Sequence, residues 1–137
     1  MTDAQVRDEA MTLFIAGHET TSMALTWTWY LLSENPNAEK RLHEEIDAVL
    51  GTRHATIDDI SRLKYSKMVL AESMRLFPPA WVIGRRNTDE YAIGDFNIPA
   101  GSLILMSQWV MHRDQRYFSK PTVFDPERWT DAAEQTR

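Results

Sequence analysis

Two pairs of polar residues in this sequence have the types and the spacing to do chemistry. Glu19 and Thr20 are adjacent in an otherwise apolar stretch, and a carboxylate beside a hydroxyl can act as a proton relay. Glu72 and Arg75 are three residues apart, so on a helix their side chains share a face and can form an ion pair. The sequence contains no cysteine, which excludes a disulfide scaffold and zinc bound by cysteine.

The ion pair has two interpretations. Glu72 stands in a stripe of apolar residues at three- and four-residue spacing: Tyr65, Met68, Val69 and Leu76. If this stripe is buried, a lone carboxylate would be costly, and we expect Arg75 to pair with it through a bidentate guanidinium. If the stripe is exposed, the pair is an ordinary surface contact worth a few tenths of a kcal/mol. The spacing alone leaves both interpretations open.

The glycine and the polar residues of the apolar stretch also allow more than one interpretation. Gly17 lacks a side chain, so another group could approach the helix backbone closely there. The other interpretation is a glycine that serves helix packing, with the polar side chains facing solvent. His18 and Glu19 begin like the zinc-protease pattern His-Glu-x-x-His, but Ser22 occupies the second histidine position. A metal-binding module that uses His18, Glu19 and His43 has suitable residue types, and no ligand spacing supports it.

A long helix must position Glu19 and Thr20. Thr2 and Gln5 fit a capping box, and residues 3–33 contain no proline and one glycine. This predicts a helix about 45 Å long at about 1.5 Å per residue. Its residues are apolar on nearly every side, which is typical of a helix surrounded by neighbours. The rest of the sequence is too short to surround it, so we expect the chain to be a piece of a larger protein.

Shorter elements follow this helix. We expect a helix from Pro36 to about residue 50 with Asn35 as N-cap and Gly51 at its end, a helical turn over 57–60, and a third helix over 62–77 that Pro78 stops. The expected strands cover residues 81–86, 91–93, 96–98 and 103–107. The predicted fold class is mainly α with a small β-sheet. We expect one fragment over 1–137, with a helical part (1–77), short strands (78–111) and a loop-rich segment (112–137).

The composition restricts the partners of the chain. A formal net charge of -5 disfavours nucleic acid and anionic membrane surfaces. The first residues are polar and acidic, and no apolar run approaches the about 20 residues of a membrane span. We therefore expect a soluble, cytoplasmic protein without a membrane span.

Four segments, in their order along the chain, resemble motifs of the cytochrome P450 family of haem-thiolate monooxygenases. Residues 16–21 (Ala-Gly-His-Glu-Thr-Thr) are similar to its oxygen-activation motif, and 72–75 (Glu-Ser-Met-Arg) to its Glu-x-x-Arg helix. Residues 76–79 (Leu-Phe-Pro-Pro) resemble the segment that follows, and 124–129 (Phe-Asp-Pro-Glu-Arg-Trp) the Pro-Glu-Arg motif. The resemblance covers nearly the whole chain. It implies a fragment of the P450 fold with a long central helix, a Glu-x-x-Arg helix and short strands.

The resemblance implies roles for individual residues. Glu19 and Thr20 would be catalytic and would guide protons during oxygen activation. The residues near the haem would be Ala16 and Gly17 over its face and Arg85 at a propionate. The substrate pocket would be lined by Phe14, Ala80, Trp81, Val82 and Ile83. A buried structural triad that braces the haem-binding core would consist of Glu72, Arg75 and Arg128.

The implied cofactor is haem b, with its iron. The parent enzyme would insert one oxygen atom of O2 into a small apolar substrate, using electrons from a ferredoxin or a flavin reductase. The family's Phe-x-x-Gly loop, which leads to the cysteine ligand of the iron, should follow Arg128 and is absent from the 137 residues. We therefore expect this chain to be inactive by itself. If it folds alone, we expect it to form oligomers or to exchange helices. The alternative function is a truncated non-catalytic paralogue or interaction fragment that oligomerises through exposed apolar helix faces.

Overall fold

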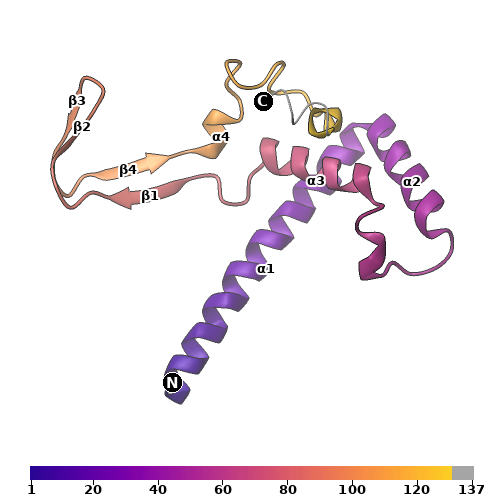
Figure 1. The fold of residues 1–137 in the computed structure, drawn as a ribbon, viewed down its shortest axis with the longest axis horizontal. Coiled ribbons are helices and arrows are strands. Elements are labelled where there is room, and N and C mark those ends of the chain that lie inside the picture. Colours follow the sequence, from indigo (N-terminus) through magenta and orange to yellow (C-terminus); the bar gives the residue numbers. More distant parts are fainter. Residues whose placement is uncertain (131–137) are drawn as a thin grey trace.

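The computed structural model describes residues 1–130 and is mainly helical with small antiparallel sheets, which confirms the predicted fold class (Figure 1). The helices are α1 (Asp3–Glu34), α2 (Pro36–Leu50), α3 (Lys64–Leu76) and α4 (Gln108–Met111), with 3₁₀ turns η1 (Ile57–Asp59) and η2 (Pro126–Trp129). The strands are β1 (Ile83–Arg86), β2 (Tyr91–Ile93), β3 (Phe96–Ile98) and β4 (Leu103–Met106).

Helix α1 begins with the predicted capping box. The Thr2 hydroxyl accepts a hydrogen bond from the Gln5 backbone N–H (3.3 Å), and the Gln5 side chain accepts one from the Thr2 N–H (2.8 Å). Asn35 occupies the predicted N-cap position of α2, but its side chain makes no capping hydrogen bond there. Asn35 Nδ2 instead donates to the Leu31 carbonyl (2.7 Å), because the last carbonyls of α1 have no partner within the helix. Asn35 therefore closes α1 with its side chain, and Pro36 starts α2 at the first helical position.

The connection from α2 to α3 is fixed by two carboxylates. The Asp59 carboxylate is buried and accepts hydrogen bonds from both terminal nitrogens of Arg53 (2.6 and 2.7 Å) and from the Thr56 N–H (2.9 Å). The Arg53 guanidinium holds the pKa of Asp59 far below its usual range, with the Thr56 N–H as the next cause. Glu45 on α2 accepts from the first free N–H groups of α3, those of Tyr65 (2.6 Å) and Ser66 (2.9 Å). Because the first N–H groups of a helix lack partners within it, Glu45 supplies the cap for α3.

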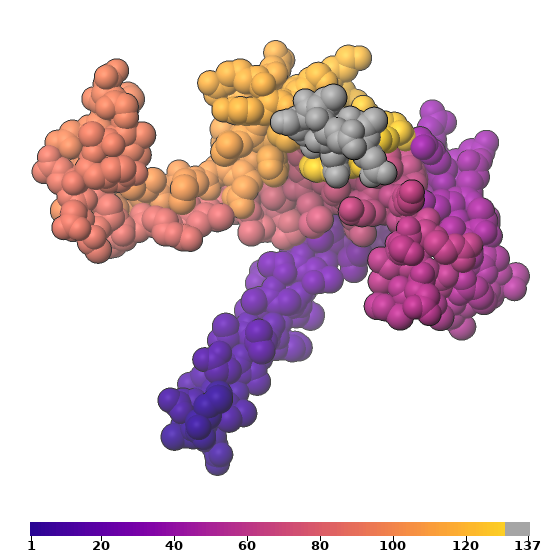
Figure 2. All heavy atoms as spheres, in the orientation of Figure 1, coloured from indigo at the N-terminus to yellow at the C-terminus, as the bar shows by residue number. Residues whose placement is uncertain are grey.

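The hydrophobic core lies where the end of α1, α2 and α3 meet. Its buried residues are Leu32, Leu42, Tyr65 and Val69, and Ala38, Ile46, Met68 and Phe124 pack around them. Residues 1–23 are exposed, although the sequence predicted a helix surrounded by neighbours. Figure 2 shows the reason, since the N-terminal part of α1 stands out from the rest of the molecule as a separate rod. The described chain covers only the C-terminal end of this apolar helix.

The strands form two separate antiparallel pairs rather than the single small sheet that we expected. β1 pairs with β4, with Ile83 opposite Met106, and β2 pairs with β3, with Tyr91 opposite Ile98. The two pairs form an arm that extends away from α3 (Figure 1). The sequence also missed α4, where the Ser107 hydroxyl accepts a hydrogen bond from the Val110 N–H (3.4 Å) and starts a helical turn.

No helix within residues 1–130 is both long enough and apolar enough to cross a membrane.

Candidate functional site

The most deeply buried polar group of the site is the carboxylate of Glu72 on α3, whose exposed fraction is 0%. Arg75 binds it through two nitrogens, Nε (2.8 Å) and Nη2 (2.9 Å). Arg128 Nε (3.2 Å), Trp129 Nε1 (2.9 Å) and the Asp125 N–H (3.0 Å) also donate to it. The stripe on α3 is thus buried, and the surface interpretation of the ion pair is wrong. Two guanidinium groups and two neutral donors replace the water that the carboxylate loses on burial.

Arg75 is as fully bonded as its partner. Besides its bonds to Glu72, its Nη1 donates to the carbonyls of His112 (2.7 Å) and Pro121 (2.7 Å), and its Nη2 to that of Val123 (3.2 Å). The rigid fork of an arginine is the side chain that can satisfy so many acceptors at once. Arg75 therefore ties the chain after α4 to α3.

His112 closes this link from the opposite direction. Its Nδ1 lies 3.1 Å from the Arg75 carbonyl, while its own carbonyl accepts from the Arg75 side chain. Burial lowers the pKa of His112, which favours the neutral ring with Nδ1–H as donor. The role of His112 in this contact is structural.

Arg128 belongs to both the Glu72 cluster and the loop around it. Its Nη2 donates to the Lys120 carbonyl (2.9 Å) and its Nη1 to the Ser119 hydroxyl (3.3 Å). The structure thus brings Glu72, Arg75 and Arg128 together. The sequence analysis did not identify Trp129 as a donor to Glu72. The available signal was its place next to Arg128 in the motif, because an indole N–H can donate a hydrogen bond.

The polar motif on α1 is open to solvent. Thr20 Oγ1 donates to the Ala16 carbonyl one turn earlier (2.6 Å), and Ser22 Oγ donates to the Glu19 carbonyl (2.9 Å). A Cβ added at Gly17 would meet no atom within 4 Å, so the helix surface there is accessible to another group. Glu19 and Thr20 are on the same helix turn, and the Thr20 hydroxyl is directed to the backbone rather than to the Glu19 carboxylate.

The structure does not bring the expected pocket residues together. Phe14 lies on the exposed part of α1, where its ring stacks on that of His18 (5.3 Å between centroids). Residues 80–83 lead into β1, and Figure 1 shows β1 well apart from the first half of α1. Arg85 on β1 is exposed and donates to the Gly84 carbonyl (2.9 Å). Within residues 1–130, Phe14 and residues 80–83 therefore do not line a common pocket.

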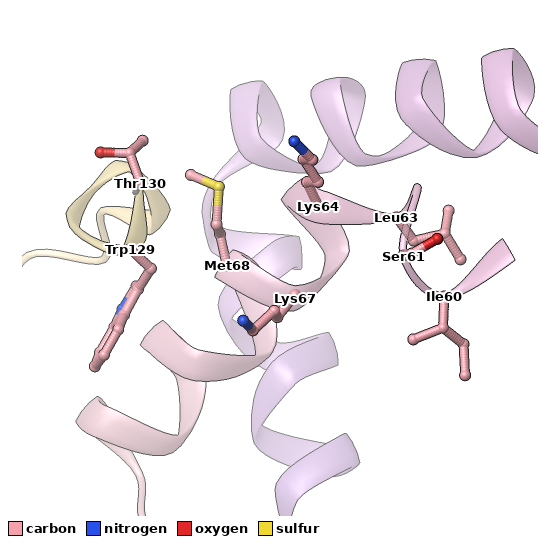
Figure 3. A pocket seen from close by; sticks show the side chains of 8 residues that line it. All are labelled: Ile60, Ser61, Leu63, Lys64, Lys67, Met68, Trp129 and Thr130. Atoms are coloured by element: carbon pink, nitrogen blue, oxygen red, sulfur yellow. The ribbon is translucent and has the colours of Figure 1, made fainter. Parts of the chain in front are cut away.

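A hollow of about 560 Å³ lies between the start of α3 and Trp129 (Figure 3). Its lining includes Lys64, Lys67 and Met68 of α3 on one side and Trp129 on the other. None of the site residues expected from the sequence lines it. Because Thr130, the last described residue, forms part of its rim, we assign no ligand to this hollow.

Residues 1–130 contain no group of three or more His, Asp or Glu side chains that could hold a metal ion. The structure thus gives no support to a metal site of His18, Glu19 and His43.

The sequence model of the cytochrome P450 family matches residues 1–137, and the chain belongs to this family. It is 47% identical over 129 residues to cyclooctatin synthase of Streptomyces melanosporofaciens, covering 94% of this chain and 28% of that protein. It is 44% identical over 125 residues to the chloroplastic protein LUTEIN DEFICIENT 5 of Arabidopsis thaliana (91% and 21%). Cyclooctat-9-en-7-ol 5-monooxygenase of Streptomyces melanosporofaciens is 41% identical over 127 residues (93% and 28%). The family resemblance is confirmed, and the chain spans between 21% and 28% of the length of these relatives.

Proposed function

We propose that these residues form the oxygen-activation helix and the Glu-x-x-Arg core of a haem-dependent monooxygenase. One atom of O2 is inserted into a C–H bond of the substrate to give an alcohol, and the other leaves as water. The reaction takes two electrons from a redox partner, a ferredoxin or a flavin reductase, and two protons. The observation that supports this proposal best is the Glu72 cluster, in which three residues far apart in sequence meet in a chain of this family.

The residues on α1 and β1 are compatible with a bound haem. Gly17 offers an open backbone surface, and Ala16 and Arg85 are exposed. Ala16 and Gly17 would contact the haem face and Arg85 a propionate. When bound, the haem iron with its thiolate ligand supplies oxygen activation and electron transfer. The 137 residues contain no cysteine, so the thiolate would have to come from outside them, and we propose that this chain alone is inactive.

Thr20 and Glu19 have the chemistry to hold and move protons in this reaction. The Thr20 hydroxyl is oriented by its bond to the Ala16 carbonyl, which leaves its oxygen lone pairs available to a bound water. Glu19 is exposed and can exchange protons with solvent. A positioned hydroxyl and a carboxylate that exchanges with water are the parts of a proton relay. Thr20 is therefore the proposed catalytic hydroxyl, and Glu19 the proposed proton source.

We propose a small apolar substrate. Four of the five expected pocket residues have hydrocarbon or aromatic side chains larger than a methyl group: Phe14, Trp81, Val82 and Ile83. Such side chains bind apolar surface and offer few groups that orient a polar ligand. Ala80 leaves room beside them.

Thr20→Ala tests the function in a haem-loaded polypeptide that contains these residues. With an electron donor and an apolar substrate, we expect the variant to divert electrons from product to hydrogen peroxide, because the relay has lost its hydroxyl. Thr26→Ala is the matched control, since Thr26 also donates to its own helix (Ser22 carbonyl, 2.8 Å) and lies about two and a half turns away from Gly17. Equal product yields for Thr20→Ala and the parent protein would contradict the assignment of Thr20.

Self-association is a second candidate function, favoured by the exposed apolar residues of α1. Leu13, Phe14 and Ile15 have exposed fractions of 74%, 61% and 54%. A helix with this surface can bury it against a second copy of the chain. Light scattering tests this candidate, which predicts oligomers at micromolar concentration, and a monomer at all concentrations would exclude it.

A further inference from the structure

The contact between α1 and α3 contains a buried pair of hydroxyls. Thr28 and Ser73 are both buried, and Thr28 Oγ1 lies 2.9 Å from Ser73 Oγ and 2.7 Å from the Ala24 carbonyl. Ser73 stands between Glu72 and Arg75 in the sequence of α3, so this pair joins α1 directly to the buried ion-pair cluster. Thr28 is the one buried polar residue on α1 among residues 1–130.

A ring stack lies beside the hydroxyl pair. Trp27 and Phe77 are parallel, with 4.2 Å between ring centroids and an angle of 7° between planes. Tyr30 meets the Phe77 ring edge-on at 6.4 Å. Aromatic surface binds strongly, but a stacked pair tolerates sliding and rotation more easily than a hydrogen bond does. The hydroxyl pair therefore supplies the directional part of this contact.

Helix periodicity connects this contact to the α1 motif. At about 100° per residue, Gly17 and Thr20 lie within about 40° of the centre of the face that carries Trp27 and Thr28. Glu19 points about 130° away from that centre by the same estimate. The rotation of α1 about its axis at Thr28 therefore decides which way Thr20 and Gly17 face.

Small rotations matter at this distance. Side chains reach about 5–6 Å from a helix axis, so a rotation of about 10° moves a group at the helix surface by about 1 Å. A displacement of about 1 Å at a reacting group can cost about 100-fold in rate. α1 is continuous from Asp3 to Glu34, so a rotation at Thr28 is transmitted along the helix to Thr20.

We propose that the Thr28–Ser73 hydrogen bond is a positioning contact, which fixes the rotation of α1 against α3 and so aims Thr20 and Gly17. This inference rests on the proposed function for its consequence in catalysis. The contact itself can be tested without haem.

The first test measures the orientation of α1 in this chain. The chain contains no cysteine, so spin labels can be placed on cysteines introduced at Leu13 and His43, which are both exposed. We expect Thr28→Val and Ser73→Ala each to shift or broaden the distance between the labels by about 1–3 Å, which corresponds to a rotation of about 10–30° at the helix surface. Thr28→Ser keeps the hydroxyl and should preserve the distance.

Thr26→Val is the matched control, because it removes a hydroxyl that bonds only within α1. It should leave the label distance unchanged. Far-UV circular dichroism of each variant separates a rotated helix from a chain that has lost its fold. A Thr28→Val chain that is folded and keeps the parent's label distance would overturn the proposal.

The second test uses the haem-loaded polypeptide. Thr28→Val should raise the share of electrons lost to hydrogen peroxide and lower kcat with little change in KM, because it moves Thr20 without touching the expected pocket residues. Thr28→Ser should restore coupling. A changed label distance with unchanged peroxide release would overturn the link from Thr28 to Thr20. If the parent protein itself shows no monooxygenase activity, the proposed function fails, and the label distances still decide whether Thr28 sets the rotation of α1.

Discussion

Glu72 is a buried charged residue whose carboxylate has hydrogen-bond partners in place of the water that it loses. Its carboxylate accepts from two guanidinium groups, an indole and a backbone N–H, and Arg75 in turn donates to three carbonyls of the chain after α4. Such a network is stable only while every member is satisfied, since removing one leaves a buried charge or donor without a partner. The loss of stability on removing one member can therefore be tested by substituting single residues.

Arg75→Lys should destabilise the chain by about 3 kcal/mol, because a lysine keeps the charge but cannot supply the same fork of donors. Urea unfolding followed by circular dichroism measures the change. Arg116→Lys is the control, since Arg116 is exposed and its ion pair with Asp114 joins residues two positions apart on the surface. Equal unfolding midpoints for Arg75→Lys and Arg116→Lys would show that the network does not carry the stability that we assign to it.

At the scale of elements, short local signals determine where helices begin and end. Gly51 ends α2 with a φ of 59°, a conformation that residues with a side chain adopt at a cost. Gly17 lies inside α1 with free space around its Cα. The same substitution should therefore have opposite effects at the two positions.

Gly51→Ala should lower the free energy of unfolding by about 1–2 kcal/mol, because it places a Cβ in the left-handed region. Gly17→Ala should stabilise the local helix by about 0.5–1 kcal/mol, because alanine loses less backbone freedom than glycine. Urea unfolding reports the first change, and amide hydrogen exchange of the first half of α1 reports the second. If Gly51→Ala proves as stable as the parent chain, the C-cap assignment is wrong.

The link between α2 and α3 should depend on pH through Asp59. Its pKa is lowered in the folded chain, so its stabilising contribution is fully present above the unfolded pKa of about 3.9 and is lost as the pH falls below that value. Asp59→Asn cannot titrate. The difference in unfolding free energy between the parent chain and Asp59→Asn should be constant above about pH 5 and should shrink as the pH falls from about 4 toward 2. A difference that does not change with pH would refute this role.

The sequence predicted those features of the elements that depend on neighbouring residues in the chain, and it missed those that depend on residues distant in sequence. The capping box at Thr2, Pro36 and Gly51 are local signals, and they predicted the bounds of α1 and α2 within a residue or two. The Asn35 side chain bonds to α1 rather than to α2. The strands separate into two pairs. Both features depend on neighbours in space. The indole of Trp129 reaches Glu72 across 57 positions of sequence, which no local pattern encodes.

At the scale of the whole molecule, burial is concentrated on one side. α3 is packed by α1, α2 and η2, whereas the first half of α1 and the strand arm extend away from it (Figures 1 and 2). The residues proposed for catalysis and for contact with haem lie on these extended parts, and the Glu72 cluster lies in the packed part. The chain therefore holds the structural core of the proposed site in place while the reactive surface remains open. The chain matches between 21% and 28% of the length of its relatives, which are about three to four times as long.

We propose that these residues carry helices of a haem monooxygenase but not the thiolate that its iron needs. The direct test is the visible spectrum of the purified chain with added haem, reduced under carbon monoxide, with the intact mass taken on the same sample. We predict no thiolate-type shifted band at a mass that matches 137 residues, and its appearance once a cysteine-bearing segment of the family follows Arg137. A thiolate-type band from the 137 residues alone would contradict the account, since none of them is a cysteine.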